Sequence, residues 1–89
     1  MLDELVKRLA NDYETIELHD DGIQYFRLSN GIIFYLVFFP DDNFYTVSYA
    51  NDIEDAKKYF FTEGDQFDGD WPFGDLLGKI KEELEYEPQ

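Results

Sequence analysis

The chain has 89 residues, a formal charge of -14 and an aromatic content of 19%. Its length predicts one domain over residues 1–89, and the absence of cysteine excludes a disulfide framework and a thiolate metal site. Phosphates and anionic lipids repel a chain this negative, so we expect neither direct nucleic-acid binding nor membrane binding. The aromatic content argues against disorder, because it offers enough apolar surface for a core.

The first half of the chain is predicted to form one helix and four strands. Apolar residues at helical spacing indicate a helix over 2–11. Asp21-Gly22 and Asn30-Gly31 are typical of two-residue hairpin turns, in which both central residues need positive φ. With a further turn at 40–43 they delimit four strands, expected over 13–19, 23–29, 32–39 and 44–50.

The second half is predicted to be helical, with one exposed acidic loop. Asn51 or Asp52 can cap a helix over 52–61. Residues 63–70 carry four acids and two glycines, which is typical of a loop. A last helix is expected over 71–86, with Gly78 at a close approach between two elements. Its apolar stripe consists of Phe73, Leu76, Leu77, Ile80 and Leu84.

Together these elements predict an α+β domain. We expect a four-stranded antiparallel β-meander, with an N-terminal helix and two C-terminal helices packed mainly on one face. Two-residue turns would pair Tyr25 with both Leu18 and Leu36, and the turn at 40–43 would pair Phe39 with Phe44. The core face would then carry Ile16, Leu18, Ile23, Tyr25, Phe34, Leu36, Phe38, Tyr45, Val47 and Tyr49.

The opposite face of this predicted sheet is more apolar than a solvated face should be. In the expected register it presents Phe26, Tyr35 and Phe44. Contiguous apolar patches usually mark a contact surface. We therefore expect a helix, a second protomer or a partner to cover these three rings, and we assign them to an apolar partner-binding face.

No pattern in the chain indicates catalysis, so we expect a non-enzymatic protein without catalytic residues, cofactor or metal. His19 is the only histidine and cannot build a two-histidine metal site. Asp65–Asp70 has a faint likeness to a calcium loop, but Phe67 occupies a ligand position. Leu76 stands where such a loop needs its bidentate glutamate.

The distribution of charge along the chain is more informative. Residues 9–26 contain five acids and no Lys or Arg, and residues 59–78 repeat this pattern. Surfaces of one sign steer association with oppositely charged partners. We therefore predict an electrostatic partner-binding site formed by Glu63, Asp65, Asp68, Asp70, Asp20 and Asp21.

These observations favour an acidic protein-binding module whose partner is a basic protein surface. We expect it to inhibit a nuclease or another DNA- or RNA-acting protein by occupying its nucleic-acid-binding surface. In size, charge and coarse architecture the chain resembles the small acidic inhibitors among phage anti-restriction and anti-CRISPR proteins and nuclease immunity proteins. No motif carries this resemblance, so no residue roles follow from it.

Two alternatives remain open at this point. One is a homodimeric accessory domain that uses the aromatic sheet face. The other is an ion-binding or small-ligand-binding domain that uses the acidic loop 63–70. Because no basic segment followed by an apolar run opens the chain, we expect a cytoplasmic protein. The resemblance to small acidic inhibitors implies a phage or bacterial source.

Overall fold

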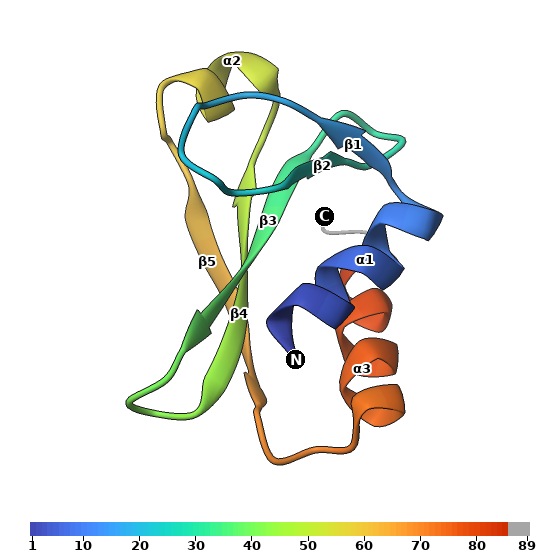
Figure 1. Cartoon of the computed structure of the whole chain (residues 1–89). Coiled ribbons are helices and arrows are strands. Elements are labelled where there is room, and N and C mark those ends of the chain that lie inside the picture. Colours follow the sequence, from blue (N-terminus) through green and yellow to red (C-terminus); the bar gives the residue numbers. More distant parts are fainter. Residues whose placement is uncertain (86–89) are drawn as a thin grey trace.

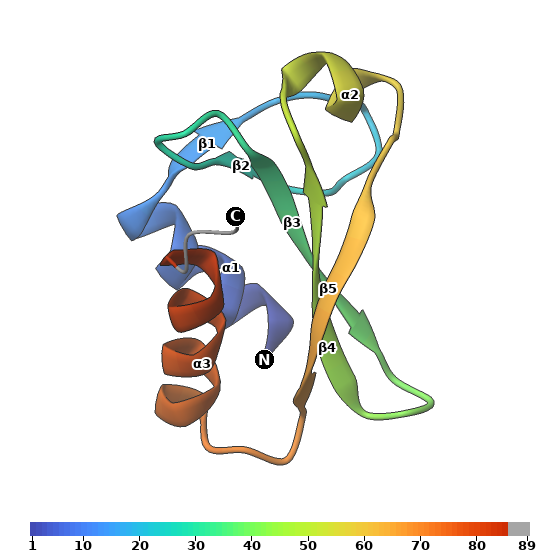
Figure 2. The same cartoon turned by 180° about the vertical axis from the view of Figure 1, so that it is seen from behind.

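A twisted antiparallel sheet separates two helices on one side from a short helix on the other (Figures 1 and 2). The computed structural model describes residues 1–85. The elements follow the chain in the order α1 (Leu2–Asp12), β1 (Glu14–Ile16), β2 (Tyr25–Arg27), β3 (Ile33–Phe39), β4 (Phe44–Ala50), α2 (Ile53–Lys57), β5 (Thr62–Asp68) and α3 (Phe73–Glu85). The strands lie in the sheet in the same order, each antiparallel to its neighbour.

The predicted α+β class, the antiparallel sheet and the two terminal helices are confirmed. The predicted count of four strands is wrong, because the sheet has five. The predicted helix over 52–61 ends at Lys57, and its residues pack on the sheet face opposite α1 and α3. Residue 86 of the predicted last helix lies outside the described residues.

The fifth strand replaces most of the acidic loop predicted at 63–70. β5 pairs with β4, with Asp68 opposite Phe44 and Phe67 opposite Tyr45. Acidic residues and glycine are poor strand formers, but the pairing gives partners to backbone groups along β4 that would otherwise be left without them. β5 is also an edge strand, where charged side chains oppose pairing with another chain. The acids of β5 therefore protect the edge of the sheet from pairing with another chain.

Gly64 accommodates the irregular pairing of β5 with β4, where the register shifts between Thr46 and Ser48. A Cβ atom at this position would lie 2.6 Å from Cε2 of Tyr49 and 3.1 Å from the carbonyl oxygen of Val47. Only glycine fits there without a shift of the neighbouring atoms.

The turn at Asn30-Gly31 is one residue longer than predicted. Gly31 has φ 94°, whereas Asn30 does not have positive φ, so the two-residue turn with two positive φ values cannot form. The Gly31 N–H donates to the Leu28 carbonyl at 2.9 Å, and the Leu28 N–H donates to the Ile32 carbonyl at 2.8 Å. Residues 29–31 therefore form a three-residue loop that ends in a left-handed glycine.

This extra residue shifts the β2–β3 register by one and moves every β2 side chain to the other face. Phe26 pairs with Phe34, and their rings stack with centroids 5.0 Å apart. The predicted pairing of Tyr25 with Leu36 is therefore wrong. The predicted pairing of Tyr25 with Leu18 is also wrong, because Tyr25 lies opposite Ile16. Residues 17–24 form a long connection in place of a tight turn at Asp21-Gly22.

The sheet buries apolar residues on both faces. The main core lies between the sheet and helices α1 and α3, and it contains Leu5, Leu9, Phe26, Phe34, Leu36, Tyr45, Val47, Phe67, Leu76, Leu77, Ile80 and Leu84. A smaller cluster on the other face contains Tyr25, Ile33, Ala50 and Ala56. α2 covers this second cluster, which gives part of the apolar second face a helix from within the chain.

Gly78 does not lie at a close approach, contrary to expectation, because a Cβ atom there would meet nothing within 4 Å. Gly78→Ala should therefore raise the free energy of unfolding by about 0.5–1 kcal/mol through higher helix propensity. Gly69→Ala is the matched control, since its Cβ would lie 2.8 Å from the Asn43 carbonyl oxygen and should destabilise the fold. Urea unfolding of both variants measures the difference, and a stability loss for Gly78→Ala would contradict this packing.

Within residues 1–85, no helix has both the length and the apolar character needed to cross a membrane.

Candidate interaction surface

The β3–β4 turn and the β5–α3 connection meet at one end of the sheet and bring four acids together (Figure 1). The Gly69 N–H donates to the Asn43 carbonyl at 2.9 Å, and Asn43 Nδ2 donates to Asp70 Oδ1 at 2.8 Å. The Asp70 N–H donates to Asp68 Oδ1, also at 2.8 Å. We call this end, formed by Asp41, Asp42, Asp68 and Asp70, the acidic end. Its two segments, 40–44 and 68–71, contain no Lys or Arg.

An apolar pair lies beside the acidic end on the sheet face that α1 and α3 do not cover. Phe39 and Phe44 pair across β3 and β4, with ring centroids 4.9 Å apart. Both rings are only half-buried. Phe44 lies opposite Asp68, so an acidic side chain shares the face with the rings. We call this side of the molecule, which also carries α2, the outer side.

The predicted apolar face does not exist as a unit. Phe26 is fully buried beneath α1 and α3 because of the register shift, so it leaves the set. Tyr35 lies on the outer side, where its ring meets Phe61 edge-on at 4.9 Å and packs against the α2 cluster. Phe44 alone of the three lies beside the acidic end. The structure thus splits the three rings among three environments.

The predicted electrostatic residues are also divided. Asp68 and Asp70 belong to the acidic end. The connection 17–24, which carries Asp20 and Asp21, and the start of β5, which carries Glu63, lie at the opposite end of the sheet, near α2 (Figures 1 and 2). Asp65 lies within β5 between these two ends. The six acids therefore form two groups and one intermediate position, not a single cluster.

Asp20 and Asp21 belong to the connection 17–24, which is held by hydrogen bonds of its own. The Tyr25 hydroxyl donates to Asp21 Oδ2 at 2.8 Å, and the Ile23 N–H donates to Asp21 Oδ1 at 3.0 Å. The Tyr25 hydrogen bond holds the pKa of Asp21 below its ordinary value. Asp21 therefore stays negatively charged at neutral pH.

Two exposed aromatic residues follow α2 and were not expected from the sequence. Tyr59 is 59% exposed and Phe60 is 63% exposed. The Tyr59 ring stacks on His19, with centroids 3.8 Å apart and planes inclined by 13°. His19 Nε2 lies 2.9 Å from the Ala56 carbonyl oxygen, which fixes the imidazole against α2. We call Tyr59 and Phe60 the aromatic tip.

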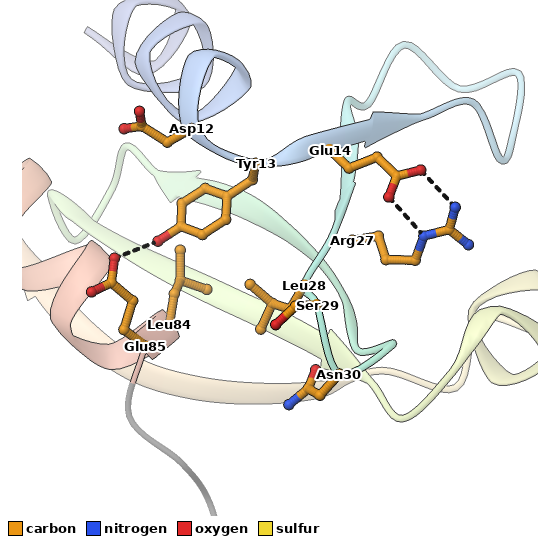
Figure 3. A pocket seen from close by; sticks show the side chains of 9 residues that line it. All are labelled: Asp12, Tyr13, Glu14, Arg27, Leu28, Ser29, Asn30, Leu84 and Glu85. Carbon is orange, nitrogen blue, oxygen red and sulfur yellow. Dashed lines mark hydrogen bonds and ion pairs between the residues drawn. The ribbon is translucent and has the colours of Figure 1, made fainter.

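A cavity of about 490 Å³ opens where the end of α1 meets the end of α3 (Figure 3). Four of its polar side chains bond to one another in two pairs. The Tyr13 hydroxyl donates to Glu85 Oε2 at 3.1 Å, and Arg27 forms two hydrogen bonds with Glu14. Burial, followed by the Glu85 carboxylate, raises the pKa of Tyr13 to about 12. A ligand that needed these groups would first have to break the pairs that hold the elements together.

Glu83 on α3 is a half-buried carboxylate, and one of its oxygens is buried without a full set of hydrogen bonds within residues 1–85. Its Oε1 accepts a hydrogen bond from the Asp65 N–H at 3.1 Å, but its buried Oε2 has no hydrogen-bond partner there. Burial is the main cause that raises the pKa of Glu83 above its ordinary value of 4.5, and Asp65 adds to it. Burial beside this carboxylate also raises the pKa of Tyr49. α3 is thus joined to β5 through a carboxylate that is costly to ionise.

Glu83→Gln should raise stability at neutral pH. A carboxyl group with a raised pKa in the fold binds its proton more tightly there than in the unfolded chain, so ionisation costs stability as pH rises past the ordinary value. The gain should therefore be present at pH 7, decline as the pH falls through the raised pKa toward 4.5, and be absent below about 4. Glu82→Gln on the same helix is the control, because Glu82 is exposed and the charge change is equal. Thermal unfolding across pH tests this, and equal pH profiles for the two variants would contradict it.

Among residues 1–85, no three His, Asp or Glu side chains lie close enough together to hold a metal ion. Since 62–68 is a strand, its acids do not converge as they would in a calcium loop. No family model matches the chain, and neither the curated proteins nor the solved structures compared with it contain a match. Function must therefore be argued from this surface alone.

Proposed function

We propose that the protein is a non-enzymatic acidic binding module whose outer side docks onto a basic surface of another protein. The partner we propose is a nuclease or another DNA- or RNA-acting protein, and docking would occupy the surface it uses for nucleic acid. The small acidic inhibitors among phage anti-restriction, anti-CRISPR and immunity proteins are the analogy for this mode of action. Analogy of size and charge is weaker support than the geometry of the surface.

The observation that carries the proposal is the acidic end. Four carboxylates lie on two segments without a Lys or Arg, and the hydrogen bonds of Asn43 with Gly69 and Asp70 join the two segments. Fixed charges of one sign raise the rate of encounter with an opposite surface and need no rearrangement on binding. The half-buried pair Phe39 and Phe44 beside them supplies apolar area at the same place. Protein interfaces commonly have an aromatic-rich centre and a polar rim, and these rings with the acids beside them fit that arrangement.

The size of the outer side suits a protein partner better than a small ligand. The molecule is 34 Å long in its largest dimension. A standard interface buries roughly 800 Å² of each partner, a patch that an outer side of this length can supply. The acidic end and the α2 end lie at opposite ends of this side (Figure 1). A long basic groove that binds nucleic acid could meet both.

A homodimer remains the second candidate, because Phe39 and Phe44 are not fully covered by the chain itself. Its acidic end would place like charges near each other in a symmetric contact, which opposes association. Sedimentation at low and high salt separates the two candidates. A dimer that forms more readily at high salt would favour the accessory domain over the basic partner.

Capture from the source cell tests the proposal. The tagged protein is incubated with lysate at low salt, washed at low or high salt, and the retained proteins are identified. We expect a nucleic-acid-acting protein that is released at high salt and that an oligonucleotide displaces competitively. A partner that binds oligonucleotide and this protein at the same time would contradict the proposed mode of action.

A further inference from the structure

Two consecutive residues that follow α2, Tyr59 and Phe60, have conformations or exposures that are unfavourable for stability. The Tyr59 N–H donates to the Ala56 carbonyl and the Phe60 N–H donates to the Asp55 carbonyl, which is the double hydrogen bond of a Schellman helix ending. In this motif the first residue past the cap is left-handed and is usually glycine. Here it is Tyr59, with φ 62°.

Phe60 departs from the same motif in a second way. The residue at its position commonly makes an apolar contact back onto the last turn of the helix. Phe60 is instead 63% exposed, the largest exposed fraction of any large apolar residue among those described. A strained residue followed by a bare ring is a combination that stability does not favour, and backbone strain of this kind tends to persist at functional sites.

His19, the only histidine of the chain, holds the Tyr59 ring of the aromatic tip in place. His19 stacks on one face of the Tyr59 ring and is itself anchored at the Ala56 carbonyl. One face of Tyr59 is thus occupied from behind, while the residue remains 59% exposed. The Tyr59 ring of the tip is therefore preorganised, which lowers the entropy lost on binding.

The negative charge around the aromatic tip favours a positively charged ligand there. The two segments that form this end, 17–24 and 51–63, carry seven acids against two lysines. Lys57 pairs with Glu54 at 3.8 Å, so part of the positive charge is neutralised locally. A guanidinium group stacks on aromatic faces and is attracted by surrounding carboxylates. Phosphates and acidic peptides are repelled by the same surface.

We propose that the aromatic tip is the anchor that takes arginine side chains of the basic partner. This inference rests on the proposed function, and it specifies which side chains of the partner bind at one end of the outer side. The acidic end speeds encounter, whereas the tip supplies contacts that stack and exclude water. Aromatic residues with this role dominate the energetics of protein interfaces.

The test uses an end-capped peptide of alternating arginine and glycine, with a citrulline peptide as the neutral control of equal shape. Binding at low salt is measured for the wild-type protein, Phe60→Ser, Tyr59→Gly and Phe60→Tyr. Phe60→Tyr is the matched control, because it keeps an aromatic ring at the exposed position 60. We expect Phe60→Ser and Tyr59→Gly each to weaken arginine-peptide binding by about tenfold, and Phe60→Tyr to leave it unchanged.

Melting temperatures separate binding from folding. Tyr59→Gly should melt at an equal or higher temperature, because glycine relieves the left-handed strain, and Phe60→Ser should be unchanged. Equal arginine-peptide binding by wild type and both tip variants would overturn the inference while leaving the proposed function standing. No binding of the arginine peptide to the wild type, or equal binding of the citrulline peptide, would overturn both. Lower melting temperatures for both variants would show that the rings serve the fold and would also overturn the inference.

Discussion

Phe26→Ala is expected to lower the free energy of unfolding by about 3–5 kcal/mol, the usual loss for a buried phenylalanine. Phe26 is fully buried, stacks on Phe34 and lies beneath α1 and α3. Removing its ring leaves a cavity in the main core. The predicted loss is a large part of the total, because folded domains are only marginally stable. Chemical denaturation monitored by far-UV circular dichroism measures the loss.

Phe44→Ala is the matched control for this prediction. It deletes the same side chain from a half-buried position on the outer side, so its effect on stability should be clearly smaller. In the register expected from the sequence the two rings would share one face and behave alike. Equal losses for the two variants would therefore contradict the observed β2–β3 pairing.

Reversing the charge of Asp41 and Asp42 together to Lys should slow association with the basic partner by about tenfold or more at low salt. Each change removes a negative charge and adds a positive one in the β3–β4 turn of the acidic end. These two residues are preferred because Asp68 and Asp70 make side-chain hydrogen bonds that order this end. The fold should be equally stable or slightly more stable, since exposed like charges repel.

Glu4→Lys with Glu82→Lys is the control for this reversal. It makes the same change in net charge on α1 and α3, away from the outer side. Stopped-flow association with the captured partner compares the two double variants. Equal slowing would show that overall charge, and not the acidic end, governs encounter.

Much of the fold could be predicted from periodicity. The terminal helices and their apolar stripe were expected, and the four-residue turn that pairs Phe39 with Phe44 was expected in the correct register. These features depend on local signals, such as helical spacing and a turn that needs one special residue. Asn43 supplies that residue here, with φ 54°.

The two main errors, the β2–β3 register and the missing fifth strand, arose because both features depend on tertiary contacts and not on the local sequence. Asn30-Gly31 permits both a two-residue and a three-residue loop, and only packing against α1 and α3 decides which face of β2 is buried. β5 has a single buried apolar residue, Phe67, so its strand character depends on the open edge of β4. Propensity was overridden by tertiary pairing in this segment.

The candidate surface was only partly predictable for the same reasons. Composition indicated an acidic surface, and sequence reasoning placed Asp68 and Asp70 in it but assigned Phe44 to a separate apolar face. It could not show that Asp20, Asp21 and Glu63 lie at the other end of the sheet. The aromatic tip was hidden inside a predicted helix over 52–61. In a sequence, a Schellman helix ending is recognised by a glycine just past the helix, and this chain has Tyr59 at that position.

The dependence of the wild-type association rate on ionic strength tests the central claim most directly. Exposed charges are screened over about 10 Å at 0.1 M salt, so a rate that depends on steering falls steeply as salt rises. We predict such a fall with the captured partner, and a shallower one for the Asp41→Lys, Asp42→Lys variant. A wild-type rate that stays flat from low to high salt would show that the acidic surface does not direct binding.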